Sequence, residues 1–105
     1  MAIYEMKYMY DWRSGVCVWS TNSAAREKYG YPVASNALPI SQALIDTLND
    51  LIARYDTALN WDNPASGLVW SAEEQSIWFH KAKAAYERLC LELGNQYTVT
   101  FEAEL

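Results

Sequence analysis

The chain has 105 residues, which fits one domain spanning residues 1–105, because the commonest domain size is about 100–150 residues. Its hydrophobic fraction of 51% and charged fraction of 20% are those of an ordinary globular protein, and they exclude wholesale disorder. A net charge of −5 argues against nucleic-acid binding, which depends on Lys and Arg contacts to phosphates, and it favours a basic partner.

The sequence carries no sign of export or of membrane insertion. Its first residues, MAIYEMKYMYDW, lack the basic region and the uninterrupted apolar region of a secretory signal. No run of about 18 apolar residues is present to cross a membrane. Cys17 and Cys90 lie far apart without a CxxC-like motif, as expected of two reduced thiols. We therefore expect a cytoplasmic protein that binds no membrane.

The first predicted element is a β-hairpin. One side of residues 3–10 is apolar or aromatic throughout, which is typical of a half-buried strand: Tyr4, Met6, Tyr8 and Tyr10. Residues 11–15 read as a turn, and residues 16–19 as the returning strand. The pattern then weakens. Residues 22–28 fit either a short helix or a polar loop, and residues 29–33 fit either irregular chain or a short edge strand.

Two helices follow, joined by the loop WDNPASGLVW at residues 61–70. The first helix begins after Ser41 as its N-cap. Its spacing predicts one core-facing stripe, made of Leu44, Ile45, Leu48, Leu51, Ile52, Tyr55 and Leu59. The second helix begins with a capping box of Ser71 and Glu74 and ends at Leu93, before Gly94.

The last predicted element is a strand at residues 96–102, in which Tyr97, Val99 and Phe101 face one way. The resulting order predicts an α+β fold. We expect a small antiparallel sheet, made of the N-terminal hairpin plus the C-terminal strand, with two helices packed on one face.

No motif gathers the residues that catalysis or metal binding requires. His80, the one histidine, falls on the polar side of a helix, and the two cysteines are far apart. The chain has no GxSxG, no local Cys–His signature and no Gly-rich phosphate loop. Three aspartates near an aromatic loop could imitate a glycosidase pair, but nothing shows that they converge: Asp11, Asp56 and Asp62. We expect no enzyme, no cofactor and no metal, with a small enzyme as an alternative.

A partner-binding surface is the strongest functional signal. The outer face of the first helix carries several carboxylates and no positive charge, and the following loop extends it with tryptophans and further carboxylates. Aromatic anchors combined with carboxylates suit an interface for Arg and Lys. A merely solvated surface is the alternative. The predicted partner-binding residues are Asp46, Asp50, Asp56, Trp61, Asp62, Trp70, Glu73 and Glu74.

Five segments that together cover most of the chain carry a resemblance to a known group of proteins: YMYDWRSGVCVW, YGYPV, LPIS, YDTALNWDNP and SAEEQSIWFHKAKAAYERLCLELGNQYTV. In them the chain resembles the small immunity proteins encoded beside toxins of bacterial contact-dependent growth inhibition and related polymorphic toxin systems. The resemblance implies a cytosolic inhibitor that binds one cognate toxin domain, frequently a nuclease, and blocks its active site or an essential surface. It assigns no individual residue, because each such protein fits its own toxin. A non-catalytic adaptor or regulatory module is the alternative reading.

Overall fold

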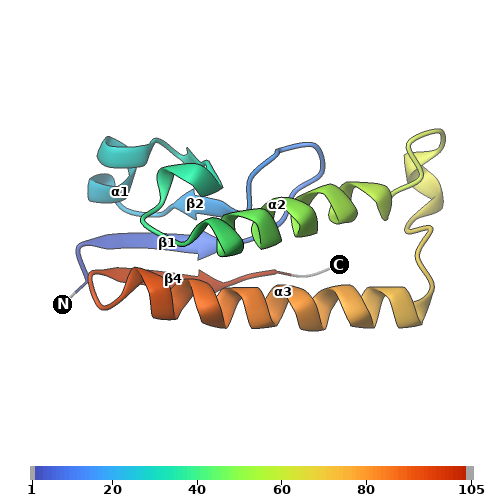
Figure 1. Cartoon of the computed structure of the whole chain (residues 1–105). Helices are drawn as coiled ribbons and strands as arrows, with labels where there is room; N and C mark the ends of the chain where they lie inside the picture. The colour runs from blue at the N-terminus through green and yellow to red at the C-terminus, as the bar shows by residue number, and fades with distance from the viewer. Residues whose placement is uncertain (1, 104–105) are drawn as a thin grey trace.

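A mixed four-stranded sheet and two long helices form the body of the protein (Figure 1). The computed structural model describes residues 2–103. The sheet has the order β3-β2-β1-β4, with β1 at Tyr4–Tyr8, β2 at Val18–Ser20, β3 at Pro32–Val33 and β4 at Tyr97–Phe101. The helices are α1 (Ser23–Tyr29), α2 (Gln42–Thr57) and α3 (Ala72–Leu93), with 3₁₀ turns η1 (Ser35–Ala37) and η2 (Pro64–Ser66). The predicted α+β class is confirmed.

The predicted hairpin and C-terminal strand are confirmed, but one strand pairing differs from the expected antiparallel sheet. β1 pairs antiparallel with β2, with Tyr8 opposite Val18, whereas β1 pairs with β4 in parallel. The direction of β4 follows from the helices. α2 and α3 run in opposite directions, so that α3 ends beside the start of β1 (Figure 1). Gly94, with a φ of 79°, then turns the chain back along β1.

The segment of weak pattern resolves into regular structure. Residues 22–28 fall largely in α1, where the Asn22 side chain accepts from the Ala25 amide at 3.0 Å as the N-cap. The same side chain also donates to the backbone oxygen of Ile3 at 3.1 Å, which ties the helix to the start of the sheet. Residues 29–33 include the short edge strand β3, in which Val33 pairs with Val18.

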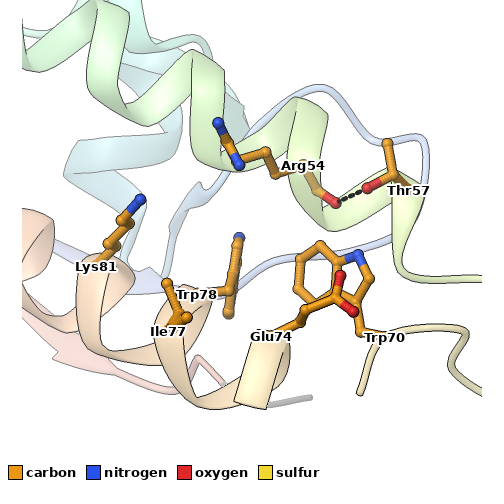
Figure 2. A pocket seen from close by; sticks show the side chains of 7 residues that line it. All are labelled: Arg54, Thr57, Trp70, Glu74, Ile77, Trp78 and Lys81. Atoms are coloured by element: carbon orange, nitrogen blue, oxygen red, sulfur yellow. Dashed lines mark hydrogen bonds between the residues drawn. The ribbon is translucent and has the colours of Figure 1, made fainter. Parts of the chain in front are cut away.

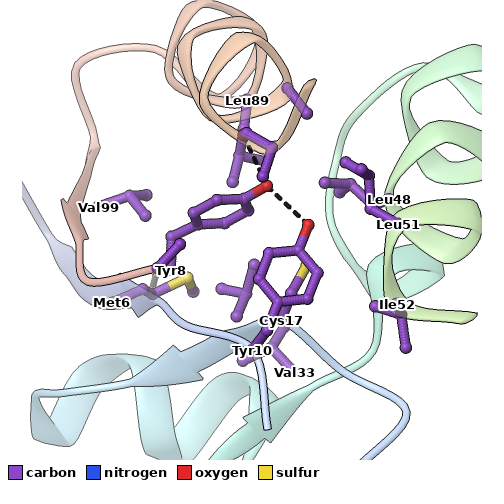
Figure 3. Close-up of a cluster of buried hydrophobic side chains, with 14 of the residues drawn as sticks. Met6, Tyr8, Tyr10, Cys17, Val33, Leu48, Leu51, Ile52, Leu89 and Val99 are labelled. Atoms are coloured by element: carbon purple, nitrogen blue, oxygen red, sulfur yellow. Dashed lines mark hydrogen bonds between the residues drawn. The ribbon is translucent and has the colours of Figure 1, made fainter. Parts of the chain in front are cut away.

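The core lies between the sheet and helices α2 and α3 (Figure 3). The predicted stripe of α2 is buried from Leu44 to Tyr55, and Leu59 is half-buried beyond the helix end. Tyr8 donates its hydroxyl to the backbone oxygen of Ala82 at 2.9 Å, and this hydroxyl lies 2.7 Å from that of Tyr10. Burial raises the pKa of both tyrosines, so they stay protonated. These bonds satisfy polar atoms that burial would otherwise penalise.

The two cysteines are free thiols, as expected. Cys17 is buried beside the core tyrosines, and this burial raises the pKa of its thiol to about 12. A protonated buried thiol reacts poorly, because the thiolate is the nucleophile. Cys90 is half-buried on α3. Both side chains contribute to packing.

Both long helices begin as predicted, and a carboxylate near the end of α3 bonds to the start of α2. Ser71 and Glu74 form the predicted capping box of α3. Ser41 caps α2, and its backbone amide and hydroxyl donate to the carboxylate of Glu92 on α3 at 2.6 and 3.0 Å. Arg88 donates to the same carboxylate at 2.7 Å. The start of α2 is therefore fixed to the end of α3.

Glu92 should make the protein more sensitive to acid. The hydrogen bond from Arg88, followed by the backbone bond from Ser41, lowers the pKa of Glu92 below its ordinary value. A lowered pKa contributes stability that is complete above the unfolded value of about 4.3 and is lost as the pH falls through the folded value. Glu92→Gln should therefore lower the Tm at pH 7 and lose less Tm than wild type between pH 7 and pH 3. Thermal unfolding measures this, with the exposed Glu87→Gln as control. Equal acid sensitivity of wild type and Glu92→Gln would contradict the assignment.

Candidate partner-binding surface

The outer face of α2 presents the first two predicted binding residues to solvent. Asp46 is exposed and accepts a hydrogen bond from the Gln42 side chain at 2.9 Å. Asp50 is exposed as well, but Arg54, one turn later, donates to it at 3.0 Å. The expectation of a face without positive charge was therefore wrong at Asp50, because the long Arg54 side chain reaches back along the helix. An exposed pair of this kind contributes only about 0.3–0.5 kcal/mol, so both charges remain available to a partner.

Asp56 lies on another side of α2 and is already engaged. It follows Arg54 by two residues, so its side chain points about 200° away from that of Arg54 around the helix axis. Its Oδ1 accepts from the backbone amide of Arg13 at 2.8 Å, and its backbone oxygen accepts from the indole Nε1 of Trp61 at 2.7 Å. Asp56 therefore holds the β1–β2 loop and the α2–α3 loop against the helix end.

Trp61 lies at the surface in an aromatic and cationic cluster. Its side chain is 37% exposed, and the Arg13 guanidinium stacks over its ring, 3.8 Å from the centroid. Trp12 meets the ring edge-on at 6.5 Å and stacks on Tyr55 at 4.0 Å. Sequence reasoning treated Trp12 and Arg13 as turn residues and missed this contact. The available signal was the unusual position of a Trp-Arg pair within the turn DWRSG.

Trp70 and Glu74 lie beside a cavity between α2 and α3. Figure 2 shows Arg54 and Thr57 of α2 facing them across this cavity of about 310 Å³. Trp70 is half-buried, with its ring centroid 6.1 Å from that of Trp78 in the core. The remaining lining residues are Ile77, Trp78 and Lys81.

A second cavity, of about 430 Å³, continues between the same two helices. Lys81 lines both cavities, and Ala84 and Arg88 extend the α3 wall of the second. Its two carboxylates each have a cationic partner within the same helix: Asp50 bonds to Arg54, and Glu92 to Arg88. The two cavities together form a groove between α2 and α3. Its lining carries both positive and negative side chains beside apolar ones.

The remaining predicted residues are Asp62 and Glu73, both exposed. Asp62 follows Trp61 in the loop, where its backbone amide donates to Asn60 at 3.1 Å. Glu73 lies in the first turn of α3, where a carboxylate interacts favourably with the helix dipole. The structure therefore divides the predicted surface into two parts: one in the α2–α3 loop around Trp61, and one in the groove between α2 and α3 around Trp70. Asp46 lies on the exposed outer face of α2.

The candidate residues for catalysis lie apart from the two cavities. Asp11, Asp56 and Asp62, the glycosidase-like candidates, line neither of the two cavities. Within residues 2–103, no three or more His, Cys, Asp or Glu side chains are grouped to hold a metal ion. His80 is exposed, and its Nδ1 lies 3.4 Å from the hydroxyl of Ser76. None of the helices that the structure describes has the length and apolar character needed to cross a membrane.

Comparison with known proteins identifies the family. Residues 4–104 match the family model described as Serratia CdiI immunity protein-like. A comparison with curated proteins gives no match. The family match spans the hairpin, all three helices and the C-terminal strand, and it confirms the resemblance seen in the sequence. The chain belongs to the Serratia CdiI immunity protein-like family, whose role is immunity in contact-dependent growth inhibition.

Proposed function

We propose that this protein neutralises one toxin domain by binding it stoichiometrically and covering its active site or an essential surface. The observation that carries the proposal is the family match over residues 4–104. The surface supports a binding role, because it combines exposed carboxylates with a partly exposed tryptophan whose contacts are already arranged. Residues of these types supply much of the energy and specificity of protein interfaces. The inhibitor acts without catalysis, in the cytoplasm.

The partner is a basic toxin domain. Asp46, Asp62 and Glu73 are exposed, and within residues 2–103 none of them forms an ion pair. Together with a net charge of −5, they would attract a positively charged surface and speed encounter with it. A toxin that acts on nucleic acid needs such a surface to bind phosphates, so a nuclease is the class that fits best.

Reversing two charges on α2 tests the acidic surface. Asp46→Lys with Asp50→Lys should cost at most about 1 kcal/mol of stability, because surface changes usually stay within about 0.5 kcal/mol each. Association with the cognate toxin domain should slow about tenfold at low salt, and the difference should shrink at high salt. Binding kinetics and growth of toxin-expressing cells measure the two effects.

The matched control is Glu27→Lys with Glu87→Lys, which makes the same change of charge at exposed positions on α1 and α3. It should bind nearly as wild type does. An equal loss in both double variants would show that only net charge matters. Wild-type binding and protection by the Asp46 and Asp50 variant would show that this face is only solvated.

A further inference from the structure

Beside Trp61 lies an arginine, Arg13, whose side-chain N–H groups have no hydrogen-bond acceptor within residues 2–103. Arg13 lies between β1 and β2, is exposed, and forms neither an ion pair nor a side-chain hydrogen bond in the described part of the chain. Its guanidinium stacks on Trp61, 3.8 Å from the ring centroid. Stacking covers a face of the planar group, whereas the N–H donors point outward within its plane. The N–H donors of the guanidinium are thus held in one orientation, and no acceptor in the described part of the chain bonds to them.

Asp56 fixes both members of this pair. Its carboxylate accepts from the backbone amide of Arg13 at 2.8 Å, and its backbone oxygen accepts from Trp61 Nε1 at 2.7 Å. The Asp56 carboxylate therefore bonds to the backbone of Arg13, and the guanidinium lies over the indole. A pair held in this way loses little conformational freedom when a partner binds.

The backbone of Arg13 is strained. Its φ of 58° makes it the one non-glycine residue with a positive φ in the described chain. Side chains with a Cβ disfavour this region, which glycine adopts readily. A strained arginine at a position suited to glycine points to a role for its side chain.

We propose that Arg13 and Trp61 together bind a carboxylate of the toxin, an Asp or Glu side chain within its otherwise basic surface. This inference rests on the proposed function and names a contact within it. Guanidinium binds carboxylate through two parallel hydrogen bonds, and Arg and Trp are frequent hot-spot residues. The carboxylates around the site attract basic toxins in general, whereas Arg13 requires one acid at a fixed place, which adds specificity. The net charge of −5 disfavours nucleic-acid phosphate as the ligand.

Three variants of this protein test the proposal against the cognate toxin domain. Arg13→Gly should keep or raise the Tm, because glycine relaxes the positive φ, and should weaken binding about tenfold or more. Arg13→Lys keeps the charge but loses the fork, and should also weaken binding. Arg26→Ala is the matched control, since Arg26 is an exposed arginine on α1 whose guanidinium also lies near an aromatic ring, 5.8 Å from the centroid of Tyr31. It should bind within about threefold of wild type. Calorimetric titration and thermal unfolding give both quantities.

The sign of the change separates this contact from a general charge effect. Removing a cation makes the protein more acidic, so recognition by net charge alone would make Arg13→Gly bind a basic toxin more tightly. Unchanged or tighter binding by Arg13→Gly would overturn the inference and leave the immunity role intact. A wild-type protein that fails to bind this toxin would overturn both.

A double-mutant cycle then locates the acid. One toxin variant with Asp→Asn or Glu→Gln should weaken binding to wild type, and the same variant should have little further effect on Arg13→Gly. Independent losses for every toxin carboxylate would overturn the pairing.

Discussion

Trp61→Ala should weaken binding to the toxin about thirtyfold or more and leave the Tm almost unchanged, because a hot-spot aromatic contributes at least about 2 kcal/mol. Trp61 is 37% exposed, and its indole bonds to the end of α2 without entering the core. The loop that carries it is closed independently, by the pairing of Leu59 with Leu68 and by a 2.7 Å bond from Val69 N to Ala58 O. Loss of the ring should therefore leave the fold in place.

Trp70→Ala is the matched comparison, with the opposite expected result. Trp70 is half-buried and packs toward Trp78, so its loss should lower the Tm and reduce activity only to the same extent. Trp61→Phe keeps a ring beneath Arg13 and should retain part of the affinity. Thermal unfolding and titration with the toxin domain, carried out on all three variants, separate the two roles. An unfolded Trp61→Ala protein would contradict the assignment of Trp61 as an anchor.

Features set by neighbouring residues could be predicted from the sequence. The alternation of Tyr4, Met6 and Tyr8 reports a half-buried strand, because side chains alternate between the faces of a sheet. Ser71 and Glu74 predict the start of α3, because both hydrogen bonds of the capping box form within one turn.

Features set by distant residues could not be predicted. Alternation in residues 97–101 shows a strand but carries no information about its neighbour, so the parallel pairing with β1 depends on where α3 ends. The acidic surface has the same limit. The sequence analysis assigned Asp56 to the same partner-binding surface as Asp50, but the Asp56 carboxylate accepts from the backbone amide of Arg13, 43 residues away, and no periodicity relates the two. The carboxylates and tryptophans of the candidate surface could therefore be proposed from the sequence, whereas the contacts of Arg13 with Asp56 and Trp61 could not.

Trp78→Ala should destabilise the protein by about 3–5 kcal/mol, the largest effect that we expect from a single change. The side chain is 3% exposed, and its Nε1 donates to the backbone oxygen of Leu51 at 3.1 Å. Its ring centroid lies 4.8 Å from that of Tyr10 and 5.2 Å from that of Tyr55. Trp78 thus joins α3 to α2 and to the chain that follows β1, and truncation leaves a cavity among all three.

The comparison with Trp78→Phe divides this loss into its parts. Phenylalanine keeps an aromatic ring but cannot donate to Leu51, so its cost should exceed the roughly 1 kcal/mol of one hydrogen bond and stay well below that of alanine. Urea unfolding gives both values. Trp78→Ala should lower the Tm by more than about 10 °C. Because the Trp78 side chain is buried and so cannot touch the toxin directly, the folded fraction of this variant should still bind the toxin with wild-type affinity. A Tm equal to that of wild type, or lost affinity in fully folded protein, would show that Trp78 does not act through the core.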